Sequence, residues 1–506
     1  MIETPTLPQG WISVELQDVA TISTGRTPNP KNGNNYGGAI PFVTPGDLVG
    51  GVVDKTERGL TEEGLEAAVM LPAGSVCVSC IGNLGKVGLL GVDGASNQQI
   101  NSIIPNHHLN NRFLLHWAKT ITKWLEENSS ATTIRIINKG RFSKAPLYLP
   151  PLNEQRRIAD KIDALQAKSR RAREALETVK PLLEKFRQSV LAAAFRGDLT
   201  AEWRKQNPDV EPASKLLERI RAERRARWEE AELAKMQAKG VKPKNDKWKE
   251  KYEEPAPVDT EGLPELPEGW CWCRLAQLIY DGPTNGFSPK SSDDATGSLS
   301  LKLSATTSGH FIANESTIKR LCVTVDPESK FWLRSGDLLI QRANSIEYLG
   351  SAAIYTGDDN TFIFPDLMMR VRTATPNLAI WLQYWFNSHL GKRYVKGNAT
   401  GTAGNMPKIN GKTVQNALLP VPPFSELRIA VQSMSEIDTY SSQLSTTVSS
   451  STKQTISLDQ SILAKAFRGE LVPQDPNDEP ASVLLKRIKA EREATPGKKK
   501  RGRKAS

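Results

Sequence analysis

Apolar residues recur at alternating steps of four and three along residues 150–199. This spacing is the heptad pattern of a helix that packs lengthwise against another helix, so it predicts one long helix. Pro150 and Pro151 precede the pattern, and prolines of this kind fix where a helix begins. The predicted seam consists of Ile158, Ile162, Leu165, Ser169, Ala172, Leu176, Val179, Leu183, Phe186 and Val190.

The same segment occurs a second time at a constant shift of 272 residues, without a gap. Pro150 corresponds to Pro422, Glu154 to Glu426, and the two copies end in AFRGDL and AFRGEL. Two unrelated amphipathic helices would not share such a register, so the pattern indicates an internal duplication. The second seam is more polar, above all over residues 449–458. It consists of Ala430, Met434, Ile437, Ser441, Leu444, Val448, Ser451, Thr455, Leu458 and Ile462.

The region before each long helix reads as a mixed domain of short strands and helices. In the first region, apolar and β-branched runs separated by glycine, proline or aspartate predict strands, and helical spacing predicts one helix over residues 112–127. The strands are predicted at residues 40–44, 75–81, 86–92 and 101–105. The second region repeats this plan loosely, from LPQGW at residue 7 to LPEGW at residue 266, with its apolar helix at residues 379–388. Divergent loops on a shared frame favour separate specificities, and drift without function is the alternative.

A third element is repeated after each long helix, as EPASKLLERIRAER and EPASVLLKRIKAER. Each copy predicts a short amphipathic helix. The first copy is followed by a charged linker over residues 228–254, and the chain ends in a basic tail that predicts sequence-independent attraction to phosphates. The predicted divisions are residues 1–149, 150–210, 211–261, 262–420, 421–472 and 473–506.

The net charge of the chain indicates which class of partner it binds. The formal net charge is +11, which favours a polyanion and above all nucleic acid. No run of eighteen apolar residues and no secretory leader is present, so a soluble, cytoplasmic protein is expected. Five cysteines in 506 residues do not form a disulfide framework and fit a reducing compartment.

Catalytic motifs are missing. The sequence has no phosphate-binding GxxxxGK(S/T), and the tetrapeptide that starts at Val421 lacks the polar residue that an amino-methyltransferase needs before its prolines. We therefore expect a non-catalytic chain without a cofactor or metal. Cys77 with Cys80, and Cys271 with Cys273, raise the possibility of zinc. Scattered histidines, and a repeat partner without cysteine, favour structural cysteines in strands.

The duplicated organisation resembles the specificity subunit of a type I DNA restriction–modification enzyme. The motifs that carry the resemblance are PPLNEQRRIADKID, AFRGDLTAEWR, QSILAKAFRGEL and LLKRIKAER, at residues 150–163, 194–204, 460–471 and 484–492. The resemblance implies an α+β fold of two globular target recognition domains, separated by two long helices packed as an antiparallel coiled coil with pseudo-twofold symmetry. The polar segment 449–458 and the long linker depart from the family pattern.

The resemblance also implies a function. Each recognition domain would read one half of a split, asymmetric DNA site, and the helices would set the gap. Residues 158–190 would span about 50 Å at roughly 1.5 Å per residue, enough for half-sites about 34–36 Å apart. Two methyltransferase subunits with S-adenosylmethionine, which methylate adenine, and two ATP- and Mg-dependent translocase–nuclease subunits would be the partners.

Candidate DNA-binding residues are polar or basic side chains on the divergent loops, because base readout needs such groups at base edges and phosphates attract cations. A solvated surface role is the alternative for each, and the neighbouring amides of residues 97–99 offer bidentate pairing to adenine. The first domain contributes Arg26, Lys31, Asn32, Thr44, Asn83, Lys86, Asn97, Gln98, Gln99, Arg135 and Lys139. The second contributes Lys290, Lys302, Ser304, Arg342, Asn344, Tyr348, Lys408 and Lys412.

Partner-binding candidates lie on the repeats, because two identical partner subunits need two similar surfaces. The alternative is that each short amphipathic helix packs on its own long helix. The candidates are Phe195, Arg196, Leu216, Leu217, Ile220, Phe467, Arg468, Leu484, Leu485 and Ile488. A protein-binding coiled-coil adaptor and a self-contained methyltransferase remain as alternative functions. The sequence alone does not reveal the target bases, the gap or whether a restriction subunit exists.

Overall fold

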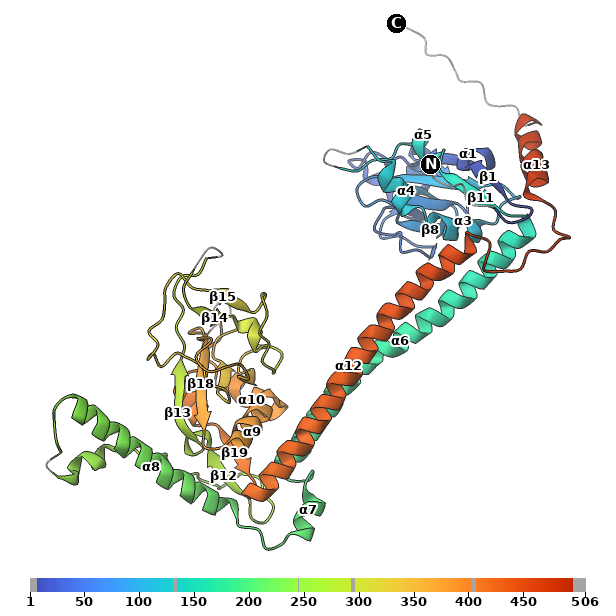
Figure 1. The fold of residues 1–506 in the computed structure, drawn as a ribbon. Coiled ribbons are helices and arrows are strands. Elements are labelled where there is room, and N and C mark those ends of the chain that lie inside the picture. Colours follow the sequence, from blue (N-terminus) through green and yellow to red (C-terminus); the bar gives the residue numbers. More distant parts are fainter. Residues whose placement is uncertain (1–6, 131–133, 244, 293–295, 402–405, 495–506) are drawn as a thin grey trace. The chain divides into compact units, whose positions relative to one another are not determined.

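The computed structural model describes residues 7–130, 134–243, 245–292, 296–401 and 406–494 (Figure 1). The chain forms two compact units, and each is described by itself. Unit 1 comprises Met1–Glu177 with Val448–Ser506, and unit 2 comprises Thr178–Thr447. Each unit therefore contains one mixed domain and one half of each long helix. Among the described residues no helix is both long and apolar enough to cross a membrane. The basic tail lies outside the described residues.

Unit 1 is built on small sheets whose strands confirm the sequence pattern. β1 and β11 form an antiparallel pair that brings the two ends of the domain together directly before the first long helix. A five-stranded sheet has the order β2-β10-β7-β8-β4, and a four-stranded sheet the order β5-β3-β9-β6. The strands are β1 (Ile12–Glu15), β2 (Ala20–Thr24), β3 (Tyr36–Val43), β4 (Val52–Val53), β5 (Gly59–Leu60), β6 (Met70–Leu71), β7 (Val76–Ser79), β8 (Val87–Leu90), β9 (Gly94–Ser96), β10 (Ile100–Pro105) and β11 (Pro146–Leu149).

The helix predicted over residues 112–127 is in fact two helices. α3 (Asn111–Ala118) and α4 (Thr122–Glu127) are separated by a short break. β-Branched residues at 120–122 weaken helix propensity there, and the Thr120 hydroxyl donates to the Trp117 carbonyl at 2.7 Å. The change of direction lets Ile121 and Leu125 join the core. The shorter helices are η1 (Gly33–Asn35), α1 (Leu16–Val19), α2 (Glu62–Ala67) and α5 (Lys139–Phe142).

Unit 2 repeats this plan. β12 (Cys271–Arg274) pairs with β19 (Leu418–Val421) as β1 pairs with β11, directly before the second long helix. A four-stranded sheet has the order β13-β18-β16-β17, and β14 pairs with β15. The strands are β13 (Ile279–Asn285), β14 (Leu299–Leu301), β15 (Ile318–Arg320), β16 (Leu338–Gln341), β17 (Ala352–Ile354) and β18 (Met368–Thr373). The helices are η3 (Leu275–Gln277), η4 (Leu303–Ala305), α9 (Pro376–Asn387), α10 (His389–Gly397) and α11 (Gly411–Gln415), and α9 confirms the predicted apolar helix.

The two long helices are α6 (Leu152–Arg196) and α12 (Phe424–Ala466). In unit 1, Arg173 of α6 pairs with Asp459 of α12 at 2.5 Å. In unit 2, Arg187 pairs with Asp438 at 2.8 Å. The residue numbers run in opposite directions along the two helices, so the pair is antiparallel, as the resemblance implies. α12 runs without a break through the polar residues 449–458.

The predicted heptad seam fails at some positions in the middle of the helices. Phe186 is 52 % exposed and Leu458 53 % exposed, and Ala172 and Leu444 are exposed as well. Part-buried charged residues one position further along the chain, among them Arg173, Arg187 and Asp459, pair instead. An α-helix turns every 3.6 residues, so a strict heptad stripe drifts around its surface unless the helices supercoil enough to compensate.

The short repeated helices differ in length. After α7 (Ala201–Gln206), α8 (Ala213–Ala238) continues well beyond its repeat, whereas α13 (Ala481–Ala494) covers little more than the repeat. The charged linker then folds back as η2 (Asp246–Lys251). Trp228 of α8 stacks on Trp248 of η2, with ring centroids 5.9 Å apart, so this part of the predicted linker packs against α8.

Candidate nucleic-acid interface

Five of the predicted DNA-binding residues of unit 1 line one hollow of about 520 Å³. The end of β3, the loop after β7 and the turn before β10 meet there. The five residues are Thr44, Asn83, Lys86, Asn97 and Gln99. These residues are far apart in the sequence, and the sheet brings them together on a polar, open surface of the kind that base readout needs.

The loop between β7 and β8 presents two of these side chains to solvent. The Ser79 hydroxyl donates to the Asn83 carbonyl at 2.6 Å and accepts the Lys86 backbone N–H at 2.9 Å. One serine thus closes the loop from both sides, and the side chains of Asn83 and Lys86 point away from the core and are exposed. An exposed lysine on a loop of fixed conformation is suited to contact a phosphate or a base.

Three of the five residues have polar side-chain atoms engaged within the chain. The Thr44 hydroxyl donates to Asp47 Oδ2 at 2.7 Å, as part of a turn. Asn97 Nδ2 donates to Gln99 Oε1 at 3.0 Å, and Asn97 Oδ1 accepts the Gln99 backbone N–H at 3.0 Å. The Asn97 amide therefore stabilises the turn. Bidentate pairing of this amide to adenine would require breaking both contacts.

Arg58 lines the same hollow and was missed from the sequence. It lies next to the two-residue strand β5, where no periodic pattern marks a surface. Within the part of the chain that the structure describes, neither Arg58 nor Lys86 forms an ion pair. Asp47 faces them, but its two carboxylate oxygens already accept the backbone N–H groups of Thr44 and Glu57. The two cations of the hollow are thus available to a polyanion.

The other candidates of unit 1 are divided between exposed and engaged side chains. Arg26 is exposed and donates to the Ala68 carbonyl at 2.7 Å, beside Gln98, which accepts from the Thr27 hydroxyl. Asn32 caps η1, and Arg135 pairs with Glu126 at 2.8 Å. Lys31 and Lys139 are exposed. None of these contacts tests DNA binding, so the assignments remain predictions.

Three candidates of unit 2, Arg342, Asn344 and Tyr348, lie on the loop after β16, and Lys408 lies beside it. The Arg342 side chain lies near the carbonyls of Asp366 and Ile409, both at 3.4 Å, and Ala343 forms a bridge to Lys408. Asn344 Nδ2 donates to Gln341 Oε1 at 2.6 Å, which gives Asn344 a structural role. Lys302 donates to the Ser316 carbonyl at 3.2 Å. The remaining candidates, Lys290, Ser304, Tyr348, Lys408 and Lys412, are exposed.

Most of the partner-binding candidates prove to be core residues. Leu216 and Ile220 of α8 are buried in unit 2, and Leu484 and Ile488 of α13 are buried in unit 1. The first residues of these helices are also fixed, because the Ala213 N–H donates to the Gly269 carbonyl and the Ala481 N–H to the Gly10 carbonyl. These side chains lie in cores that combine residues of the mixed domain and the long helices, and a partner subunit cannot reach them. Phe195 is buried too, and Leu217, Phe467 and Leu485 pack partly against the same cores.

Two arginines of the partner-binding set are accessible. Arg196 pairs with Asp198 at 2.7 Å and Arg468 with Glu470 at 2.8 Å, in the equivalent turns that end the long helices. Their side chains are 61 % and 54 % exposed, so these turns offer a partner two similar charged surfaces.

The short helices are also anchored by equivalent glutamates. In unit 2 the Tyr280 hydroxyl donates to Glu223 Oε2 at 2.6 Å. Burial, and after it the contact with Glu223, raises the pKa of Tyr280 to about 12. In unit 1, His108 Nε2 lies 2.8 Å and His107 Nε2 3.3 Å from Glu491 Oε1. His107, His108 and Glu491 together could hold a metal ion, whereas the equivalent Glu223 accepts a hydrogen bond from a tyrosine.

The cysteines belong to the strands and their surroundings. Burial raises the pKa of both Cys77 and Cys80 to about 11, so these thiols are protonated at neutral pH. Cys273 is completely buried, and its pKa is raised as well. Cys77 donates or accepts a weak hydrogen bond with the Ser102 hydroxyl at 3.5 Å. Buried apolar surroundings of this kind are typical of cysteines with a structural role.

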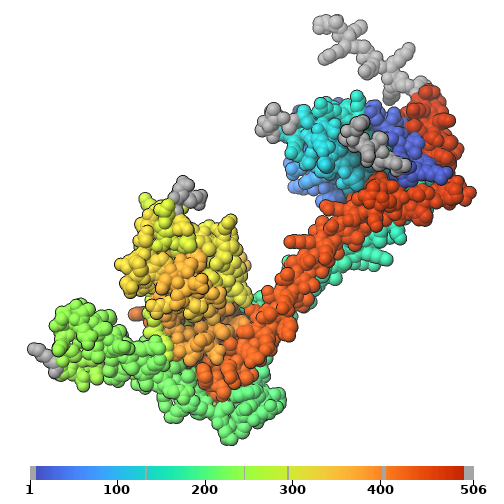
Figure 2. All heavy atoms as spheres, in the orientation of Figure 1, coloured from blue at the N-terminus to red at the C-terminus, as the bar shows by residue number. Residues whose placement is uncertain are grey.

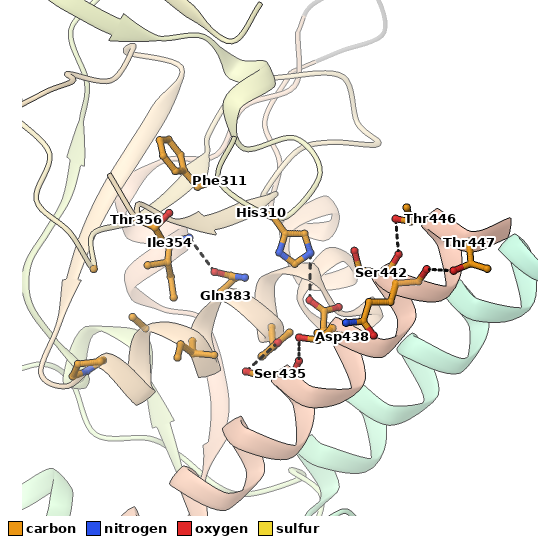
Figure 3. A pocket seen from close by; sticks show the side chains of 17 residues that line it. His310, Phe311, Ile354, Thr356, Gln383, Ser435, Asp438, Ser442, Thr446 and Thr447 are labelled. Atoms are coloured by element: carbon orange, nitrogen blue, oxygen red, sulfur yellow. Dashed lines mark hydrogen bonds and ion pairs between the residues drawn. The ribbon is translucent and has the colours of Figure 1, made fainter. Parts of the chain in front are cut away.

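A hollow of unit 2 is a different kind of site (Figure 3). It has a volume of about 940 Å³ and lies between the mixed domain and the hydroxyl-rich face of α12. His310 points across it to Asp438, with Nε2 and Oδ2 3.3 Å apart. None of the DNA-binding candidates lines it, and Asp438 also pairs with Arg187.

Replacing Lys86 with alanine should weaken DNA binding by about 1–3 kcal/mol if the ammonium group contacts a base. If it contacts a phosphate, the loss should be similar for all sequences, and the salt slope should fall by about 1. Fluorescence anisotropy at several salt concentrations measures both. Lys168→Ala is the matched control, because Lys168 is exposed on α6 and does not line the hollow. Equal affinities for the two variants would remove Lys86 from the interface.

Comparison with known proteins gives a consistent result. Residues 8–179 match the family described as type I restriction modification DNA specificity domain. The EcoKI specificity subunit of Escherichia coli K12 is 25 % identical over 97 % of this chain and 98 % of its own length. The EcoDI specificity subunit of Escherichia coli is 26 % identical over the same shares.

Solved structures agree on the fold. A chain from a study of assembly and conformational transition of the type I R-M system has a TM-score of 0.65 and 21 % identity. The match covers 92 % of the present chain and 99 % of the solved chain. The HsdS subunit from Thermoanaerobacter tengcongensis has a TM-score of 0.53 and 21 % identity over 93 % of this chain. At these identities the likeness confirms the predicted fold class.

Proposed function

We propose that this chain is a specificity subunit of the type I restriction–modification kind, like the relatives it resembles along its whole length, and that each of its two mixed domains reads one half of a split DNA site. In this proposal the chain is a specificity subunit that is non-catalytic by itself. The alternative of a coiled-coil adaptor without DNA affinity finds no support in the comparisons. What supports the proposal best is that each unit carries its own set of polar loops on the same frame.

The long helices would set the unread gap and join the two recognition domains. Both α6 and α12 run through both units, so the same two helices support each domain. The matched turns at Arg196 and Arg468 fit two copies of one partner, which in this proposal are methyltransferase subunits. S-adenosylmethionine, ATP and Mg²⁺ would be bound by the methyltransferase and translocase subunits, and the whole complex would work on adenine in the cytoplasm.

The experiment is to co-express the chain with its methyltransferase subunit in a host without adenine methylation. Single-molecule sequencing should then show modified adenines in one split motif with a fixed gap. Replacing residues 1–149 with the corresponding domain of a relative should change one half of the motif and leave the other half and the gap unchanged.

The control is a methyltransferase shown to be bound and active by its uptake of S-adenosylmethionine. Absence of any motif with such an active complex would contradict the proposal. A change in both halves after the domain exchange would contradict the assignment of one half to each domain.

A further inference from the structure

The two recognition domains present their loops through the same set of backbone contacts. In unit 1, the N–H of Gly25 donates to the Ile100 carbonyl and that of Arg26 to the Ser96 carbonyl. In unit 2, the N–H of Gly286 donates to the Met368 carbonyl and that of Phe287 to the Phe364 carbonyl. These paired contacts make the loop after β2 equivalent to the loop after β13, and the turn before β10 equivalent to the turn before β18.

A glycine is required at the same place in both loops. A Cβ on Gly25 would lie 2.2 Å from the Asn97 carbonyl oxygen, and one on Gly286 would lie 2.2 Å from those of Phe364 and Pro365. Close packing of loop against turn is therefore shared, although the sequences of the loops differ. A third contact extends the match, because the Cys80 N–H donates to the Gln99 carbonyl and the Arg342 N–H to the Leu367 carbonyl.

Gln98 of unit 1 and Asp366 of unit 2 therefore occupy equivalent positions in their turns. A hydroxyl from the neighbouring loop holds each side chain in the same way. The Thr27 hydroxyl donates to Gln98 Oε1, and the Ser288 hydroxyl donates to Asp366 Oδ1 at 2.5 Å. Both side chains are exposed at the tip of the turn. The frame is thus constant, and an amide in one unit is replaced by a carboxylate in the other.

The remaining hydrogen-bonding atoms differ in kind. The Gln98 amide keeps its Nε2 donor next to an oxygen acceptor, the combination that pairs with adenine N7 and N6. The Asp366 carboxylate can only accept, and its Oδ2 has no hydrogen-bond or ion-pair partner among the described residues. Among the base edges of the major groove, a carboxylate is suited to the amino group of cytosine.

We propose that Asp366 is a specificity-determining residue of the second recognition domain and accepts a hydrogen bond from the N4 amino group of a cytosine in its half-site. Gln98 holds the equivalent place in the first domain and reads adenine. This inference rests on the proposed function, because it assumes that both turns face DNA.

The surroundings of Asp366 support a base contact over a phosphate contact. A carboxylate is repelled by phosphates, yet this one lies on a turn beside Arg342, whose Nη1 is 3.4 Å from the Asp366 carbonyl oxygen. Lys408 lies next to the same loop through its bridge with Ala343. The cations can contact phosphates on either side, while the serine hydroxyl fixes one carboxylate oxygen and leaves the other pointing outward.

The test is the methylation motif of the Asp366→Asn variant in the complete complex, compared with the wild type. We expect one cytosine of the second half-site to lose its dominance and adenine to gain there, because asparagine pairs with adenine. The first half-site and the gap should stay unchanged. Gln98→Glu should alter one position of the first half-site only. Asp358→Asn is the matched control, since it removes the same charge from an exposed position elsewhere in unit 2.

A binding experiment covers the case in which methylation by the variant is too weak to read. Wild-type complex should bind about 5- to 150-fold less tightly when that cytosine is replaced by 2-pyrimidinone, which lacks the amino group. The Asp366→Asn complex should show no such difference between the two duplexes.

The outcomes separate this inference from the proposed function. A wild-type split motif together with an unchanged motif in Asp366→Asn would overturn the role of Asp366 and leave the proposed function standing. A wild-type complex that directs no motif would overturn the proposed function itself. Equal sensitivity of both complexes to 2-pyrimidinone would also overturn the role of Asp366.

Discussion

Replacing Arg204 with alanine should destabilise unit 2 by about 3–5 kcal/mol. Arg204 Nη2 lies 2.7 Å from Glu426 Oε1, and the Glu426 side chain is completely buried at the start of α12. The Thr200 hydroxyl donates to the same oxygen at 2.6 Å. Without the guanidinium, a buried carboxylate would keep one neutral donor, and an uncompensated buried charge is costly.

The measurement is chemical unfolding of the full chain, followed through its tryptophans, which report on both units. The midpoint of the unfolding transition of unit 2 should move to a lower denaturant concentration, and the midpoint for unit 1 should stay unchanged. Arg196→Ala is the matched control, because it removes an arginine from an exposed ion pair worth about 0–1 kcal/mol. Glu426→Gln in the Arg204→Ala background should restore part of the loss. Equal destabilisation by Arg204→Ala and Arg196→Ala would contradict the prediction.

The equivalent position in unit 1 shows why the effect of removing Arg204 could not be predicted from the repeated sequence. Glu154 is also buried, but it accepts from Trp11 Nε1 at 3.0 Å and from Gln474 Nε2 at 3.3 Å. These donors are neutral, and burial raises the pKa of Glu154. The sequence shows that Glu154 and Glu426 correspond. It does not show that one is held by an arginine and the other by a tryptophan and a glutamine.

Regular periodicity predicted the fold well. The ungapped repeat and the heptad spacing identify both long helices, and alternating apolar runs identify β7, β8 and β10. Features that depend on tertiary packing were not predicted from the sequence. The break between α3 and α4 exists because Ile121 and Leu125 turn into the core, and the exposure of Phe186 follows from helical drift over many turns.

The sequence predicted which loops form the candidate site, but it did not predict the contacts between their residues. Thr44, Lys86 and Gln99 were expected near DNA for their chemistry, and the sheet brings them to one hollow. Arg58 carried no signal, because it lies in an irregular segment whose position is set by packing. The buried Leu216 and Leu484 were open to either reading, because an apolar stripe looks the same whether it faces a partner or its own domain.

Lowering the pH from about 6.5 to 4 should cost unit 1 about 3 kcal/mol through His116 alone. The side chain is 2 % exposed, and its Nε2 lies 2.7 Å from Asp163 Oδ1. Burial, assisted by Lys119 and Arg112 and opposed by Asp163, lowers the pKa of His116 to about 4. The unfolded chain, with an ordinary histidine pKa of about 6.5, binds the proton more tightly. Stability is therefore fully present above pH 6.5 and is lost as the pH falls through 4.

The comparison that isolates this effect is wild type against His116→Gln, with the free energy of unfolding measured at several pH values between 7 and 4. Glutamine keeps a neutral donor for Asp163 and does not titrate, so the variant should lose less stability than the wild type, by about 3 kcal/mol at pH 4. Glu154 acts in the opposite direction, because its raised pKa favours the folded state as the pH falls. It contributes equally to both proteins and cancels in the difference. Parallel pH profiles for the two proteins would show that the buried histidine is not the acid-sensitive group of unit 1.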